Sequence, residues 1–162
     1  MSPAPDQKVT DLRHTLAALA YRGGKALRGA PAEFADFRVV PGGRTPVQIL
    51  AHMGDLFDWA LVLADGKHEW HNAHPLPWDA EVARFFAALE AFDRRLASGR
   101  PLGFSAEQLF QGPIADALTH VGQIAMLRRM AGCPFRGENY FMAEITVGRV
   151  GLDQAAPRVE FD

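Results

Sequence analysis

The feature that most constrains the fold is a set of four long amphipathic segments, each followed by a break rich in Gly or Pro. Apolar residues recur at spacings of three and four, the pattern of one face of an α-helix. The segments cover residues 8–27, 46–64, 78 to the break at 98–101, and 113–130. Strand signals are weak, because no hairpin dipeptide lies between alternating apolar runs. The pattern predicts an all-α fold.

The second segment has the clearest start signal. Thr45 is a favoured N-cap residue, and Pro46 suits the first helical position because its fixed φ matches that of a helix. The pair Asp65-Gly66 ends the periodic pattern. We therefore expect a helix over residues 46–64.

Segments of this length form helices about 30 Å long. Four such amphipathic rods bury their apolar faces most economically against one another, which predicts a four-helix bundle in one domain spanning residues 1–162. The links at residues 29–45 and 66–77 are long enough for crossover connections. After residue 132 we expect a short irregular C-terminal segment, with a short helix near residues 139–145 and an extended tail.

Composition argues against several classes of protein. The chain has 17 basic and 19 acidic residues, and the basic ones are scattered, so we expect no nucleic-acid partner. The most apolar stretch, residues 47–63, contains His52, Asp55 and Asp58, so we expect no membrane span. Residues 1–8 carry no signal-peptide pattern, and the single Cys133 excludes an intramolecular disulfide framework. A cytoplasmic location is the resulting expectation.

A histidine lies in the middle of the apolar stripe of the second segment. At about 100° per residue, Leu56 and Leu63 fall within about 40° of His52 around the helix. A buried imidazole needs a hydrogen-bond partner or a metal ion, since a bare polar nitrogen in a core costs about 1–3 kcal/mol. Taken alone, His52 is best interpreted as a core histidine bonded to a neighbouring side chain.

Four polar side chains share one arc of about 100° on the fourth segment: Asp116, Thr119, His120 and Gln123. Asp116 and His120 are one turn apart and can reach the same point. The simple alternative is a solvated face, but the arc lacks the Lys, Glu and Arg that usually cover one. An i,i+4 pair on one helix, joined by a ligand from a facing helix, is a known way to build a metal site in a bundle.

His52, Asp116 and His120 are therefore the predicted metal ligands. Three protein ligands leave coordination positions open for water or substrate, which is typical of catalytic sites. Gln123 and Asp55 are expected to contact these ligands on the side away from the metal ion and to hold their orientation. No general base is predicted, although Asp55 is the nearest candidate.

Other polar residues receive simpler interpretations. His68, His71 and His74 form a rival cluster at three-residue spacing, but their Asn- and Pro-containing loop offers no rigid frame, so we expect solvent-exposed histidines. Glu81 and Asp93 are interpreted as helix caps or solvated charges.

Two stretches resemble the DinB-like family of metal-binding four-helix bundles: TPVQILAH, which ends at His52, and HVGQIAMLRR, which begins at His120. The motifs ENYF and GRVG near the C-terminus are similar to the ending of one subgroup. The resemblance covers nearly the whole chain in helix order. The family's site, one His on the second helix and a His-x3-His pair on the fourth, falls on His52, Asp116 and His120, with Asp116 in place of a histidine.

The resemblance implies a divalent transition metal (Zn, Ni, Mn or Fe), with Asp116 favouring oxygen-preferring ions. Relatives use the ion in the chemistry of low-molecular-weight thiols such as mycothiol, bacillithiol or glutathione, because it lowers the pKa of a bound thiol or water. A metal-dependent thiol S-transferase or hydrolase, a role in stress response and a homodimer are thus expected. Trp59 and Tyr140 are candidate pocket walls, although aromatic residues at helical spacing are more often part of the core.

The residues leave a second class of function open. A non-catalytic bundle that dimerises or binds a small apolar ligand, with a lost or adventitious metal site, also fits the sequence. The replacement of a family histidine by Asp116 is the observation that favours this alternative.

Overall fold

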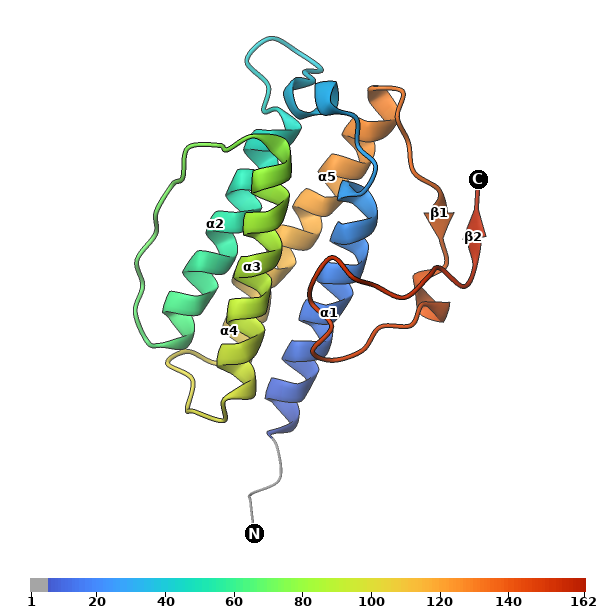
Figure 1. Cartoon of the computed structure of the whole chain (residues 1–162). Helices are drawn as coiled ribbons and strands as arrows, with labels where there is room; N and C mark the ends of the chain where they lie inside the picture. Colours follow the sequence, from blue (N-terminus) through green and yellow to red (C-terminus); the bar gives the residue numbers. More distant parts are fainter. Residues whose placement is uncertain (1–5) are drawn as a thin grey trace.

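Four long helices form the body of the protein in this computed structural model, which describes residues 6–162 (Figure 1). They are α1 (Gln7–Leu27), α2 (Pro46–Ala64), α3 (Trp78–Ala97) and α5 (Ala115–Met130). A short helix, α4 (Ala106–Leu109), and a π-helical turn, η2 (Phe110–Ile114), lead into α5. The predicted all-α fold is confirmed. Residues 1–5, part of the segment for which no signal peptide is predicted, lie outside the described range.

The helices α1 and α5 run in one direction, and α2 and α3 run in the other (Figure 1). Around the bundle the packing order is α1, α3, α2, α5 and back to α1. Ion pairs mark the parallel alignment of α2 and α3, since Arg84 contacts Asp55 near the middle of α2 and Arg95 contacts Asp65 at its end.

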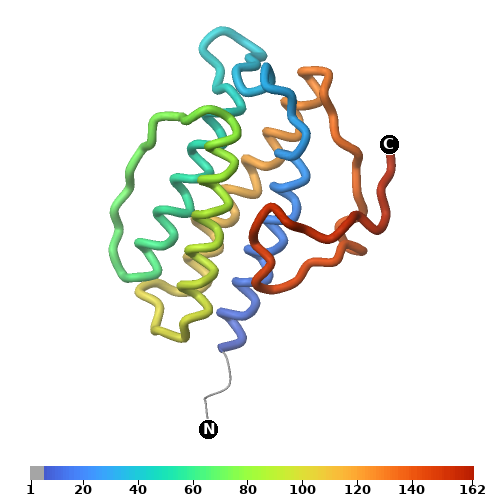
Figure 2. The backbone as a smooth tube through the Cα atoms, in the orientation of Figure 1, coloured from blue at the N-terminus to red at the C-terminus, as the bar shows by residue number. Residues whose placement is uncertain are grey.

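Two parallel helices in sequence need a link that returns along the length of the bundle. Residues 65–77, here called the crossover segment, run along α2 in this way (Figure 2). Its extended length of about 40 Å exceeds the roughly 30 Å of a helix such as α3. The crossover at this link is thereby confirmed. The earlier long link instead joins two ends at the same side of the bundle and carries a short 3-10 helix, η1 (Ala32–Asp36).

The start of α2 is determined locally, as predicted. The Thr45 hydroxyl accepts a hydrogen bond from the Gln48 amide at 3.3 Å, and Gln48 Oε1 accepts one from the Thr45 amide at 2.9 Å. This reciprocal capping box satisfies donors that the first helical turn leaves free. The bounds of α2 match the predicted 46–64.

The last helical rod begins earlier than predicted. The fourth predicted segment begins at residue 113, but Ser105 and Gln108 form a second capping box and α4 begins at Ala106. Pro113 has no amide hydrogen to donate and would break an α-helix, and the chain accommodates it in the wider turn η2. The rod therefore continues into α5, and η2 lies directly before the predicted ligands of that helix.

Two carboxylates predicted to be caps or solvated charges are buried, so that interpretation is wrong. Asp93, 6% exposed, accepts hydrogen bonds from Arg13 Nε and Nη2 at 2.8 and 2.9 Å. Glu81 is fully buried and accepts one from the Leu76 amide at 2.9 Å. Arg13 lies on another helix, which helical spacing does not reveal, whereas Leu76 lies five residues before Glu81, just ahead of α3.

The C-terminal segment after residue 132 packs against α1. Two short antiparallel strands, β1 (Gly137–Glu138) and β2 (Glu160–Phe161), pair within it, and a 3-10 turn, η3 (Tyr140–Met142), stands where a short helix was expected. Tyr21 and Lys25 of α1 both donate hydrogen bonds to the buried Glu138. The segment is irregular, as predicted, and it is held by buried polar contacts.

By length and hydropathy, α2 alone among the described helices is able to cross a membrane. Its most apolar window has a mean hydropathy of 1.3, and 61% of that window is buried inside the protein. Core helices of soluble proteins reach the same length and hydropathy, so these two properties are only weak evidence that α2 spans a membrane.

Candidate metal centre

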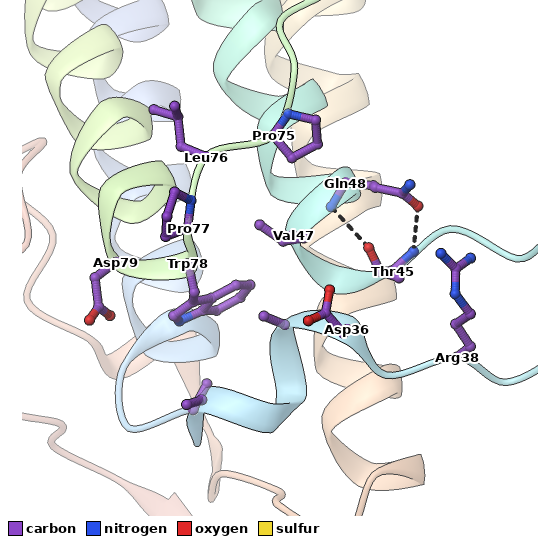
Figure 3. A pocket seen from close by; sticks show the side chains of 13 residues that line it. Asp36, Arg38, Thr45, Val47, Gln48, Pro75, Leu76, Pro77, Trp78 and Asp79 are labelled. Atoms are coloured by element: carbon purple, nitrogen blue, oxygen red, sulfur yellow. Dashed lines mark hydrogen bonds between the residues drawn. The ribbon is translucent and has the colours of Figure 1, made fainter.

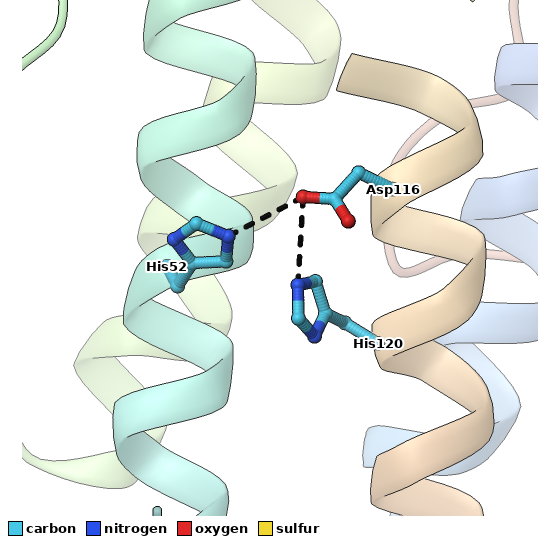
Figure 4. A group of neighbouring side chains, drawn as sticks. All are labelled: His52, Asp116 and His120. Carbon is cyan, nitrogen blue, oxygen red and sulfur yellow. Dashed lines mark hydrogen bonds and ion pairs between the residues drawn. The ribbon is translucent and has the colours of Figure 1, made fainter. Parts of the chain in front are cut away.

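The three predicted ligands come together between α2 and α5 (Figure 4). His52 projects from the middle of α2, and Asp116 and His120 project from successive turns of α5. Asp116 Oδ2 lies 3.4 Å from His52 Nε2 and 3.5 Å from His120 Nε2. The two imidazole rings are edge to face, with centroids 4.8 Å apart. One ligand atom from each residue lies within 4.8 Å of the other two.

The two separations from Asp116 fit a small divalent ion. Nitrogen and carboxylate ligands bind zinc-like ions at about 2.0–2.1 Å, and two such ligands at a tetrahedral angle are about 3.4 Å apart. The two separations from Asp116 match this value. Two imidazoles and one carboxylate are also a donor set that transition metals accept. The residues present therefore fit the ion that the sequence predicts.

Gln123 fixes the orientation of one imidazole. Its Oε1 lies 2.7 Å from His120 Nδ1, one turn along α5. An amide oxygen only accepts, so Nδ1 carries the hydrogen of this bond, and Nε2 faces Asp116 and His52. This contact is of the type that holds metal-binding histidines in place, so the orienting role of Gln123 stays a prediction that the geometry allows.

The burial of the three side chains is uneven. His120 is 11% exposed, His52 24% and Asp116 47%. The cluster thus opens to solvent on the side of Asp116. A small molecule can approach it there, while His120 is enclosed by the protein.

His52 lies at the edge of the core and not at its centre, where its helical position was expected to place it. The fully buried Leu50, Met53 and Phe57 fall about 100–160° around α2 from His52. Because α2 is apolar over more than half of its circumference, its sequence alone does not identify the face that becomes most buried. The fully buried face of α2 packs mainly against α3, and His52 is left at the seam with α5.

Trp70 of the crossover segment is a residue that the sequence interpretation missed. Its ring lies against His52, with centroids 5.5 Å apart, and edge-on to Trp59 at 5.6 Å. The Ala73 amide in the same segment donates a hydrogen bond to Asp55 of α2 at 3.1 Å. A tryptophan in an otherwise polar loop was the available signal. The crossover segment therefore forms one wall beside His52.

Three other expectations are resolved differently. Asp55 bonds to Ala73 and Arg84, so it neither orients His52 nor offers a free base. Tyr140 lies edge-on to Tyr21 at 6.1 Å, against α1, so it is no wall of this site. Trp59 contacts the cluster only through Trp70.

The rival histidines do not form a second site. All three are exposed, and His68 packs its ring against Trp59 at 5.5 Å. Among residues 6–162, the only group of His, Cys, Asp and Glu with a geometry suited to an ion is the His52, Asp116 and His120 cluster. The prediction that His68, His71 and His74 are solvent-exposed is confirmed.

A cavity of about 780 Å³ lies at the end of the bundle where α2 and α3 begin (Figure 3). Arg38, Gln48 and Trp78 are among its lining residues, and none of the three clustered residues reaches it. Two other recesses adjoin the cluster itself, one of about 740 Å³ that includes His120 and one of about 390 Å³ that includes His52.

Comparison with known proteins adds no relative. No family model matches the chain, and neither the curated proteins nor the solved structures include a similar one.

Proposed function

We propose that the protein is a metalloenzyme of the DinB-like type, in which His52, Asp116 and His120 hold one divalent transition metal ion. The observation that carries the proposal is the convergence of three donor atoms within 4.8 Å from two different helices. When bound, the ion supplies Lewis acidity, which lowers the pKa of a thiol or water and makes a nucleophile near neutral pH.

The protein's own residues have distinct roles in this proposal. His52 and His120 present neutral nitrogens, and Gln123 keeps His120 in the tautomer that a metal ligand requires. Asp116, the most exposed of the three, contributes a negative charge at the open side. Trp70 lies against His52 on the side of the crossover segment. The open side is where a low-molecular-weight thiol would enter.

Elemental analysis of untagged protein tests the metal site. We expect about one equivalent of metal in the wild type and less than one-tenth of that in His52→Ala, because two ligands do not hold a divalent ion in competition with water. His74→Ala is the matched control, since His74 is exposed and lies outside the cluster. Equal metal content in the two variants would contradict the assignment.

A turnover screen tests the chemistry. The metal-loaded protein is offered electrophiles together with glutathione, bacillithiol or mycothiol, and the loss of free thiol is followed. We expect turnover with one thiol, and we expect it to disappear in His52→Ala. Absence of metal-dependent turnover with every thiol would remove the S-transferase part of the proposal and leave the metal site.

A second candidate function follows from the same distances. The contacts of Asp116 with His52 and His120 at 3.4 and 3.5 Å also suit a polar cluster between a carboxylate and two imidazoles, without an ion. The protein would then be a non-catalytic bundle that dimerises or binds a small ligand. Metal below one-tenth occupancy in well-folded wild-type protein supports this alternative.

A further inference from the structure

Two recesses flank the candidate metal centre, and they differ in character. The larger, of about 740 Å³, joins His120 to the apolar side chains of Ile49, Met126 and Leu127. The smaller, of about 390 Å³, joins His52 to polar groups of the crossover segment and of the link before α2. Arg44 lines both recesses. Arg44 thus borders a recess beside each of the two histidines.

Arg44 is a cation without a carboxylate partner. Among residues 6–162, no ion pair or side-chain hydrogen bond involves its guanidinium, and the side chain is exposed. The carboxylate that shares its recess, Asp55, is already bonded to Arg84 and to the Ala73 amide. Arg38, in the same link, donates to the Gly43 carbonyl.

The backbone beside Arg44 is fixed. Thr45, the next residue, is 3% exposed and is held by both hydrogen bonds of the capping box of α2. The guanidinium therefore extends from a rigid attachment point, and a planar fork of donors on such a base suits bidentate binding of a carboxylate.

We propose that Arg44 binds a carboxylate group of the substrate, so that the substrate of this centre is a small organic acid carrying a thiol. This inference rests on the proposed function, because the metal ion would bind the thiol while Arg44 binds the acid. The apolar part of the molecule would lie on Ile49, Met126 and Leu127.

Charge balance favours a carboxylate over a phosphate. A divalent ion, Asp116 and Arg44 together carry a net charge of about +2 near neutral pH. One thiolate and one carboxylate neutralise this charge. A phosphate monoester, with about −2 near neutral pH, would leave an excess negative charge beside Asp116.

The test uses the full chain loaded with Co²⁺, titrated with 3-mercaptopropionate and with its neutral isostere 3-mercaptopropionamide. Binding is followed through the absorption that a thiolate produces on Co²⁺. We expect Arg44→Ala to weaken binding of the acid about fivefold and to leave binding of the amide unchanged. A fivefold change is the size expected when one partly exposed ion pair is lost. Arg44→Lys should restore part of the difference, because it keeps the charge but not the planar fork.

Arg94→Ala is the matched control. Arg94 is an exposed arginine of α3 that lines neither recess, so its removal changes the net charge equally without touching the site. Stoichiometric Co²⁺ with no selective effect of Arg44→Ala on the acid would overturn the proposal and leave the metal site intact. Failure of the wild type to bind Co²⁺ would instead overturn the proposed function, and the role of Arg44 with it.

Discussion

Two polar clusters of this protein contrast in how their groups are satisfied. Between α1 and β1, Tyr21 and Lys25 donate to the fully buried carboxylate of Glu138, and Lys25 also donates to Glu160. Between α2 and α5, His52, Asp116 and His120 turn nitrogen and oxygen atoms toward one another at the edge of the core, partly open to solvent.

This difference distinguishes the Tyr21, Lys25 and Glu138 cluster, which stabilises the fold, from the candidate metal site. In the α1 cluster each donor has an acceptor, and the contacts attach residues far apart in the sequence to one helix. In the α2–α5 cluster one carboxylate oxygen and two imidazole nitrogens face one point. Buried polar groups that satisfy one another stabilise a fold, whereas converging acceptors are suited to an added cation.

Removal of the Glu138 carboxylate should have the largest effect on folding. We expect Glu138→Ala to lower the free energy of unfolding by about 3 kcal/mol, because the Lys25 ammonium stays buried after this carboxylate is removed. Denaturant unfolding followed by circular dichroism measures this. Glu107→Ala removes an exposed ion pair with Lys8 and should leave the unfolding midpoint unchanged. Equal losses in the two variants would erase the contrast between the clusters.

A bound metal ion should stabilise the protein only through the cluster of His52, Asp116 and His120. At a free metal concentration about 100 times the dissociation constant, we expect the wild type to gain about 2.7 kcal/mol. Glu138→Ala should show the same gain, and His120→Ala should show none, because it loses a ligand. Thermal unfolding with and without metal provides the comparison. A full gain in His120→Ala would place the binding site elsewhere.

The contact between Gln123 and His120 should affect metal affinity more than folding. We expect Gln123→Ala to weaken metal binding about tenfold, because the imidazole loses the acceptor that fixes its tautomer. Isothermal titration calorimetry measures the affinity. Thr119→Ala is the control, since its hydroxyl bonds only to the Ala115 carbonyl of its own helix. A similar change in both variants would mean that Gln123 has no orienting role.

The smallest expected effect concerns alkaline pH. Burial, together with the hydrogen bond to Glu138, raises the pKa of Tyr21 well above its ordinary 10.0. Burial of Lys25 opposes its charge, but the hydrogen bonds to Glu138 and Glu160 outweigh this and raise its pKa above 10.5. Both shifts contribute stability that is present below about pH 10 and is lost as the pH rises through the folded-state values.

Tyr21→Phe isolates the tyrosine part of this effect. We expect it to cost about 1 kcal/mol near pH 7 through the lost hydrogen bond, and to make the alkaline decline of stability shallower than in the wild type. Unfolding free energies measured between pH 7 and about pH 11 test the prediction. An identical decline in the two proteins would show that Tyr21 does not contribute to it.

Local signals predicted a large part of the fold and of the site. The bounds of α2 follow from Thr45, Pro46 and the Asp65-Gly66 turn, all within a few residues of the helix ends. The i,i+4 spacing of Asp116 and His120 places them on one side of α5 whatever the helix packs against. The Ser105 capping box was equally local and was overlooked, so the early start of the last rod was predictable.

The remaining features depended on partners distant in the sequence. Trp70 and Arg44 flank the cluster only because the crossover segment runs back along α2 and the preceding link ends beside α5. The buried ion pair of Asp93 likewise depends on Arg13 of α1, which packing brings to it.

The amino-acid sequence by itself determined where the helices form and which polar side chains share a helical face, because those properties arise from contacts within one or two turns. Tertiary structure decided which face of the broadly apolar α2 became the core, and so left His52 at a seam and not at the centre. The free energy that makes this choice is the burial of apolar area between helices, and it exists only once the helices are packed together.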